Sequence, residues 1–150
     1  MVFTISKFQI RYIFILFNSS IHTRIEAAYE EVDALLHIGA EMNNFYKFIA
    51  FNNNSSFSQN FHENIIMLGD YNADCNYFSD LDLLKNKYTT LQWLMPEDTE
   101  TNPSKNSVCT YDRIVVTKDI NEHLTNKFGV DHSFTSKKVS DHYPIWYLFK

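Results

Sequence analysis

The sequence has little of what marks a membrane protein, a disulfide-rich peptide or a basic nucleic-acid binder. Its 150 residues include two cysteines, three glycines and three prolines, and the formal net charge is −5. Its most apolar run, residues 12–17, is far shorter than the roughly 20 residues that span a bilayer. An acidic chain also lacks the Lys/Arg-rich face of a classical nucleic-acid binder. It can still act on phosphate esters, because carboxylates that hold divalent cations lower the pI.

The first 20 residues do not form a good secretory signal peptide. Lys7, Gln9 and Arg11 interrupt the region where a continuous apolar stretch is needed, and no small-residue cleavage site follows. What the chain does contain is typical of one globular domain. Hydrophobic residues make up 45% of it and charged residues 21%, a balance that supports a buried core.

Hydrophobic patterning predicts an α/β or α+β fold, with a sheet layered against helices. An apolar stripe predicts a helix over residues 23–36, and residues 88–94 suit either a weak helix or a strand. Asn- and Ser-rich composition predicts a loop or insertion over 41–60, and a second loop is expected over 96–107. Strands are expected at residues 8–17, 64–68, 113–117 and 144–149.

Three polar clusters lie at the edges of apolar runs, where functional groups of layered α/β folds tend to gather. They occupy residues 69–75, 111–113 and 140–144. Asp141 and His142 suggest an acid–base pair, although adjacent residues do not face each other, so another Asp is an equally good partner for His142. A strand-start Asp and a surface His are the simpler interpretation of the same residues.

Asp70 and Asn72 point to the same side of an extended segment, which suits a hard cation or a phosphate oxygen. On these residues alone, an Asx turn that ends the strand is the favoured interpretation. Asp112 is equally consistent with a solvated carboxylate at a strand start. Cys75 and Cys109 are consistent either with two unrelated buried thiols or, in a secreted protein, with a disulfide.

Taken together, the motifs resemble those of the pancreatic deoxyribonuclease (DNase I) family. Residues 69–77 read Gly-Asp-Tyr-Asn-Ala-Asp-Cys-Asn-Tyr, and residues 109–116 read Cys-Thr-Tyr-Asp-Arg-Ile-Val-Val. The family's order continues with Ser-Asp-His-Tyr-Pro at 140–144, and residues 22–35 resemble its His-Thr segment and following helix. The Asn-Ala-Asp-Cys and Cys-x-Tyr-Asp-Arg blocks separate this family from other phosphoesterases of the endonuclease/exonuclease/phosphatase superfamily.

The resemblance implies a role for each matching residue. His22 and His142 correspond to the two catalytic histidines, and Asp112 to the carboxylate that polarises a histidine or contacts phosphate. Asp70 and Asn72 correspond to groups on the phosphate and metal side, and Asp141 to a metal ligand. Tyr111 and Arg113 are weaker candidates for DNA contact. The resemblance also implies that Cys75 and Cys109 form the family's structural disulfide.

The implied fold is part of a four-layer β-sandwich flanked by helices, with the family's N-terminal portion missing. Residues 1–21 match poorly, and residues 22–150 form a partial domain with an insertion at about 37–60. The implied activity is hydrolysis of DNA phosphodiester bonds with Mg²⁺ and Ca²⁺ and little sequence specificity. Because the family's early metal-binding glutamate has no counterpart, we expect low or no activity from this chain alone.

The resemblance implies DNA as the partner, with no membrane partner and no sign of an oligomer. It favours the secretory pathway or the extracellular space, with the nucleus as an alternative. Two other functions compete with the endonuclease. One is a non-catalytic remnant that binds DNA or protein, and the other is a different phosphoesterase of the same superfamily.

Overall fold

The computed structural model describes residues 15–17, 25–52, 65–78, 80–103, 108–133 and 140–150. A short 3-10 turn at Ile25–Ala27 leads into the long helix α1 (Ala28–Asn52), and the shorter α2 spans Leu81–Lys87. No helix in the described ranges is long and apolar enough to cross a membrane. The strands are β1 (Ile15–Phe17), β2 (Ile65–Asp70), β3 (Leu91–Trp93), β4 (Asp112–Thr117), β5 (Leu124–Val130) and β6 (Ile145–Phe149).

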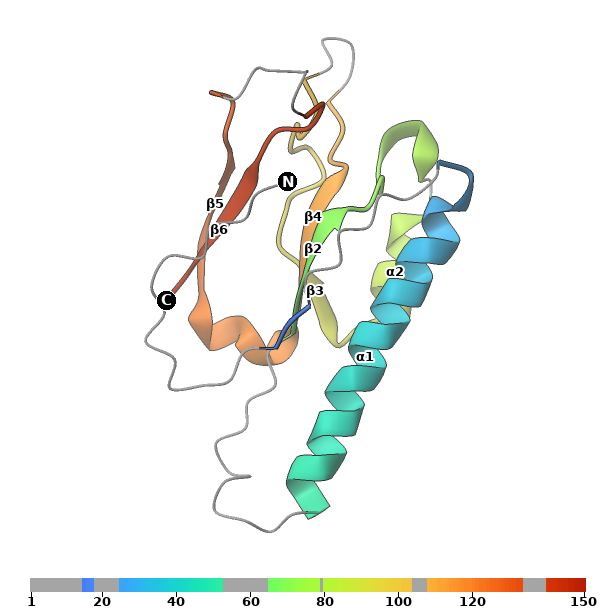
Figure 1. Ribbon diagram of the computed structural model, residues 1–150, viewed down its shortest axis with the longest axis vertical. Helices are drawn as coiled ribbons and strands as arrows, with labels where there is room; N and C mark the ends of the chain where they lie inside the picture. The colour runs from blue at the N-terminus through green and yellow to red at the C-terminus, as the bar shows by residue number, and fades with distance from the viewer. Residues whose placement is uncertain (1–14, 18–24, 53–64, 79, 104–107, 134–139) are drawn as a thin grey trace.

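Four of the strands form one sheet, which we call sheet A, in the order β1-β2-β4-β3. The pair β1 and β2 is parallel, and α1 lies between these two strands along the chain, as a parallel crossover requires. The pairs β2–β4 and β3–β4 are antiparallel. Strands β5 and β6 form a separate antiparallel pair, sheet B. Figure 1 shows α1 and α2 on one side of sheet A and sheet B on the other.

The period-2 alternation of β2 separates two apolar cores. Ile65 and Met67 face the helices, where they pack with Val32, Leu36 and Leu84. Ile66 belongs to the second core, between the two sheets. Its other members come from β4, from the 3-10 turn that follows it, from β5 and from β6: Ile114, Val116, Ile120, Leu124, Ile145, Tyr147 and Phe149. The described residues therefore form three layers, in the order helices, sheet A, sheet B.

Helix α1 approaches β2 closely at Gly39. A Cβ atom added there would lie 2.7 Å from Sδ of Met67, closer than non-bonded atoms approach. A glycine inside a helix costs about 1 kcal/mol relative to alanine. Here the absence of a side chain at Gly39 lets the helix backbone approach Met67 closely, and this packing accounts for a glycine inside the helix.

The sequence predicted the fold class correctly, and the three layers agree with part of the expected four-layer sandwich. The strands expected near 64–68, 113–117 and 144–149 are confirmed as β2, β4 and β6. Of the strand expected over 8–17, residues 15–17 form β1, and the rest lies outside the described residues. The segment 88–94 contains β3, a strand rather than a helix.

The predicted loop over 41–60 was wrong for residues 41–52, which continue α1 to Asn52. Met42, Phe45 and Ile49 recur at helical spacing, but the neighbouring Asn43 and Asn44 obscured that period in the sequence. Residues 53–60 lie outside the described part of the chain. Helix α2 and strand β5 were not predicted, because neither short segment has a clear apolar period.

Candidate active site

The three polar clusters meet at one end of sheet A. Because β2 and β4 are antiparallel, the end of β2 lies beside the start of β4, and Asp70 is the register partner of Asp112. His142 comes from the segment that precedes β6, on the neighbouring sheet. Segments far apart in the sequence therefore bring Asp70, Asp112 and His142 together, and we call these three residues the acid–histidine cluster.

Asp112 and His142 form the shortest contact of this cluster. Nδ1 of His142 lies 2.7 Å from Oδ2 of Asp112, whose side chain is fully buried. On the other side of the ring, Nε2 lies 3.6 Å from Oδ2 of Asp70. The imidazole thus stands between two carboxylates, and Nδ1–H can donate to Asp112 while Nε2 faces Asp70. The orienting partner of His142 is Asp112, not the adjacent Asp141.

This environment changes the acidity of His142. Burial alone lowers the pKa of the imidazole, because it disfavours the charged form. The hydrogen bond to Asp112 and the negative charges of Asp112, Asp70 and Asp141 outweigh burial and raise the pKa to about 9. His142 is therefore largely protonated near neutral pH in the absence of a cation.

Asp70 and Asn72 form the turn that follows β2. The backbone N–H of Asn72 donates to Oδ1 of Asp70 over 3.0 Å, as in an Asx turn. Asn72 has a φ of 45°, in the left-handed region that asparagine tolerates better than most residues. The turn uses Oδ1 of Asp70, while Oδ2 faces His142. One carboxylate thus serves the turn and the candidate site together.

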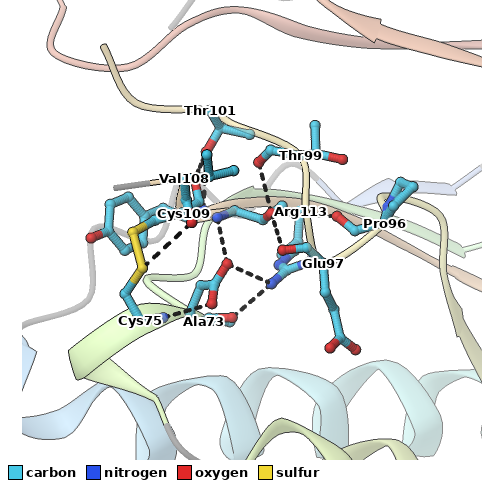
Figure 2. A network of polar contacts seen from close by, with 12 residues as sticks. Ala73, Cys75, Pro96, Glu97, Thr99, Thr101, Val108, Cys109 and Arg113 are labelled. Carbon is cyan, nitrogen blue, oxygen red and sulfur yellow. Dashed lines mark hydrogen bonds and ion pairs between the residues drawn. A yellow bond between two sulfur atoms is a disulfide. The ribbon is translucent and has the colours of Figure 1, made fainter. Parts of the chain in front are cut away.

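The segment after this turn is fixed to the start of β4 by a covalent and a polar link. Cys75 and Cys109 form a disulfide, which confirms the pairing that the resemblance implied. Asp74 accepts hydrogen bonds from the N–H of Cys75 and the N–H of Thr110, each over 2.6 Å. Figure 2 shows the disulfide beside the polar network around Arg113. These links hold the turn with Asp70 against the strand with Asp112.

Arg113 lies beneath the site rather than on its surface. Its side chain is 1% exposed, donates from Nη2 to the carbonyl of Ala73 over 2.7 Å, and lies 3.9 Å from Asp74. Burial lowers the pKa of the guanidinium to about 10, although the charges of Asp74, Glu97 and Asp112 oppose the shift. The predicted contact of Arg113 with DNA stays a prediction. Through its contacts with Ala73 and Asp74, Arg113 fixes the segment that follows the turn.

Tyr111 lines the site next to the histidine. Its ring centroid lies 5.9 Å from that of His142 and 5.4 Å from that of Tyr77. Burial raises the pKa of the phenol, with smaller contributions from Tyr77, Asp74 and Asp70. The side chain is partly exposed, so its predicted contact with DNA stays a prediction.

The last two predicted site residues are Asp141 and His22. Asp141 is exposed and lies outside the group of atoms that surrounds His142, although its charge contributes to the raised pKa. Its role as a metal ligand stays a prediction. His22 lies outside the described residues, so its predicted role also stays a prediction.

The composition of the cluster suits a divalent cation. One ligand atom from each of Asp70, Asp112 and His142 lies within 4.8 Å of the other two. Among the described residues, Oδ1 of Asp112 is a buried acceptor without a hydrogen-bond partner. A buried carboxylate oxygen usually has a donor or a cation beside it. The donor set therefore fits a metal site on the carboxylate side of the cluster.

Two threonines near the site were missed by the sequence analysis. Thr101 and Thr110 are fully buried, and both lie in irregular segments. The hydroxyl of Thr110 donates within the loop of residues 96–101, where the carbonyls of Thr99 and Glu97 lie 2.7 and 2.8 Å away. Thr101 lies in a stretch typical of a solvated loop, and Thr110 lies inside the motif of residues 109–116, which does not show that its hydroxyl is buried.

Comparison with known proteins places the chain beside deoxyribonucleases, although no family model matches it. Deoxyribonuclease-1 of Canis lupus familiaris is 34% identical over 98 residues, which cover 55% of this chain and 34% of that protein. Deoxyribonuclease-1-like 1 of Rattus norvegicus is 34% identical over 94 residues, covering 55% and 30%. Deoxyribonuclease-1-like 2 of Mus musculus is 30% identical over 101 residues, covering 59% and 36%.

The chain spans about a third of the length of the curated relatives it matches. The matches nevertheless agree with the resemblance that the motifs around Asp70, Asp112 and His142 indicated. Over the matched residues, the chain is similar to proteins named deoxyribonuclease-1 and deoxyribonuclease-1-like.

Proposed function

We propose that this protein is a divalent-metal-dependent endonuclease that hydrolyses DNA phosphodiester bonds with little sequence specificity. The observation that carries the proposal is the imidazole of His142 held 2.7 Å from a fully buried carboxylate, with a second carboxylate on its other side. The names of the relatives, all deoxyribonucleases, supply the substrate class.

The geometry gives His142 a specific task. A hydrogen bond from Nδ1 to Asp112 fixes the orientation of the ring and leaves Nε2 as the atom that exchanges a proton with substrate. Because its pKa is raised to about 9, the histidine carries a proton near neutral pH. We assign it as the general acid. Water attacks phosphorus, the bond from phosphorus to the 3′-oxygen breaks, and that oxygen takes the proton from Nε2.

The second proton transfer needs a base that accepts a proton from the attacking water. We propose His22 for this role, on the resemblance of residues 22–35 to the family segment. The carboxylates of Asp70 and Asp112 would hold the cation. On the resemblance, Asp141 would be a further ligand and Asn72 would lie beside them on the phosphate side. A bound Mg²⁺ or Ca²⁺ would supply stabilisation of the negative charge that develops on the phosphate oxygens.

The disulfide supports a proposed location. Structural disulfides persist in oxidising compartments and are rare in the cytosol. With Cys75 paired to Cys109, we propose that the protein works in the secretory pathway or outside the cell.

A plasmid-nicking assay tests the function. Purified wild-type protein is incubated with supercoiled plasmid in Mg²⁺ and Ca²⁺, beside an EDTA control and His142→Ala. His37→Ala is the matched control, since His37 is an exposed histidine on α1. We expect slow nicking by wild type and His37→Ala, in line with the low activity that the resemblance implies for this chain, and none by His142→Ala or in EDTA.

Folded wild-type protein that does not nick the plasmid would contradict the proposal. If such protein still retards DNA in a gel, the non-catalytic binding protein becomes the better explanation. If it instead releases phosphate from a small phosphate ester, another phosphoesterase activity becomes the better explanation.

A further inference from the structure

Thr101 occupies an unusual position for a loop residue. It lies in a segment without helix or strand, yet its side chain is 0% exposed. Threonine is mostly found at the surface, and a buried hydroxyl needs hydrogen-bond partners. The partners of Thr101 belong to the two segments that carry Asp112 and His142.

The hydroxyl uses its full bonding capacity. A hydroxyl has one donor and two acceptor positions. Oγ1 of Thr101 accepts from the N–H of Tyr111 over 3.0 Å and from the N–H of Asp112 over 3.2 Å. It also lies 3.4 Å from the carbonyl of Cys109, to which it donates. A single side chain therefore satisfies two backbone donors at the start of β4.

The sheet explains why β4 needs this side chain. The carbonyl of Ile114 accepts from the N–H of Leu94, so the polar groups of Ile114 point toward β3. Asp112 lies two residues earlier, and the period of a strand directs its N–H to the same side. Strand β3 ends at Trp93, before it reaches Asp112. The hydroxyl of Thr101 therefore accepts the N–H of Asp112 in place of a backbone carbonyl of a longer β3.

The backbone of Thr101 binds the segment that carries the histidine. Its carbonyl accepts from the N–H of Tyr143 over 2.8 Å, and Tyr143 directly follows His142. Its own N–H donates to the carbonyl of Cys109 over 3.1 Å. Figure 2 shows Thr101 beside Cys109, above the network that contains Arg113. Thr101 thus contacts the backbone of Asp112 and that of Tyr143, the residue after His142.

We propose that Thr101 is a positioning residue, whose hydroxyl and carbonyl together set the distance between Asp112 and His142. The effect on catalysis rests on the proposed nuclease function, whereas the effect on the Asp112–His142 contact does not. Without the hydroxyl, two buried N–H groups lose their acceptor, and the start of β4 can shift relative to the segment that carries His142.

Three substitutions separate positioning from stability. Thr101→Val keeps the shape and removes the hydroxyl, whereas Thr101→Ser keeps the hydroxyl. Thr117→Val is the matched control, because Thr117 is also 0% exposed and accepts a backbone N–H, that of Ile65, at the opposite end of β4. Thr101→Val removes the acceptor of two backbone N–H groups and Thr117→Val that of one. Both should therefore destabilise the fold, Thr101→Val by more than Thr117→Val.

The first readout is the proton NMR signal of the His142 Nδ1–H, recorded in EDTA. A hydrogen bond to a carboxylate moves this signal strongly downfield. We expect the downfield signal in wild type, Thr101→Ser and Thr117→Val, and its loss or upfield shift in folded Thr101→Val. An unchanged signal in Thr101→Val, or no such signal in wild type, would overturn the proposal.

The second readout is turnover in the nicking assay. We expect kcat of Thr101→Val to fall about 10- to 100-fold, the usual cost of losing a supporting contact in a catalytic site, with KM little changed. Thr101→Ser and Thr117→Val should stay within a few-fold of wild type. Equal losses of kcat in Thr101→Val and Thr117→Val would assign Thr101 a general structural role and contradict the proposal.

Amide hydrogen exchange in the wild type covers the case in which Thr101→Val does not fold. The N–H groups of Tyr111 and Asp112 should exchange slowly, although none of the described strands pairs with them beyond the end of β3. Exchange as fast as that of an exposed loop would overturn the proposal. If wild type lacks nuclease activity but the NMR and exchange results hold, the proposed function fails and the positioning role stands.

Discussion

The two ends of β4 share a strand but differ in what they bury. All six residues from Asp112 to Thr117 are buried. At the far end, the neutral hydroxyl of Thr117 accepts the N–H of Ile65 over 3.2 Å. At the site end, a carboxylate is buried beside a histidine, with Arg113 next to it in sequence and also buried.

The difference lies in the cost of burial. Removing a hydroxyl from water costs a few kcal/mol at most when it has a partner, whereas an unpaired buried charge costs far more. The fold therefore pairs the carboxylate of Asp112 with His142 and the guanidinium of Arg113 with the Ala73 carbonyl and Asp74, whereas the far end needs no such pairing. Such costly arrangements cluster at functional sites, which is why we assign function to this end of the sheet.

The largest expected difference between the two ends is in turnover. Asp112→Asn keeps the shape of the side chain but removes the charge that orients and polarises His142. We expect it to lower plasmid nicking by roughly 10²- to 10⁴-fold, whereas Thr117→Val stays near wild type. Equal activity of folded Asp112→Asn and wild type, measured as initial nicking rates, would break the comparison.

The disulfide should provide the next largest effect, now on stability. In the chain-entropy model, a loop closed across 34 residues of separation contributes about 4 kcal/mol. We expect Cys75→Ser with Cys109→Ser to lower the free energy of unfolding by about that amount. Urea denaturation followed by circular dichroism measures it. A loss below about 1 kcal/mol would mean that the Asp74 network alone fixes the turn.

The acidity of His142 sharpens the comparison further. In metal-free wild type we expect its pKa near 9, and in Asp112→Asn a value near or below the ordinary 6.5, since burial then acts with fewer opposing charges. NMR titration of the ring protons in EDTA measures both. An unchanged pKa of His142 in the variant would show that the charges of Asp70 and Asp141, not that of Asp112, keep this pKa raised.

The same shift gives the sign of the pH effect on stability. A folded-state pKa raised from 6.5 to about 9 means that folding favours the protonated ring. This contribution is fully present below about pH 6.5 and is lost as pH rises through about 9. In Asp112→Asn this pH-dependent loss of stability should be smaller. The free energies of unfolding of wild type and variant, plotted against pH, should therefore converge at high pH.

The smallest expected effect lies away from both ends of β4. Leu148 points outward from β6 and is 49% exposed. We expect Leu148→Thr to change the free energy of unfolding by less than about 0.5 kcal/mol, since surface substitutions rarely do more, and to leave nicking unchanged. A thermal melt and the nicking assay check both. A clear loss of either would show that this face contributes more than its exposure indicates.

The sequence predicted the site better than it predicted the elements between its parts. Asp70, Asp112 and His142 were identified because each lies in a motif at a strand end, and antiparallel pairing brings such ends together. The burial of Arg113 could not be predicted, because its motif does not reveal which side of β4 it occupies.

Thr101 could not be identified from sequence at all. Its role depends on where β3 ends relative to β4, which is a property of the sheet and not of the loop. The extension of α1 to Asn52 was missed for a related reason. Local composition there favoured a loop, whereas the structure continues the helix to Asn52.

The disulfide also shortens the path that the folding chain must close. Asp70 and Asp112 are 42 residues apart along the backbone. Through the sulfur bridge they are eight apart, five from Asp70 to Cys75 and three from Cys109 to Asp112. Once oxidised, even an unfolded chain keeps the two carboxylates as near neighbours, so their pairing becomes an almost local search. A protease cut anywhere between the cysteines would likewise leave both carboxylates on one covalently joined molecule.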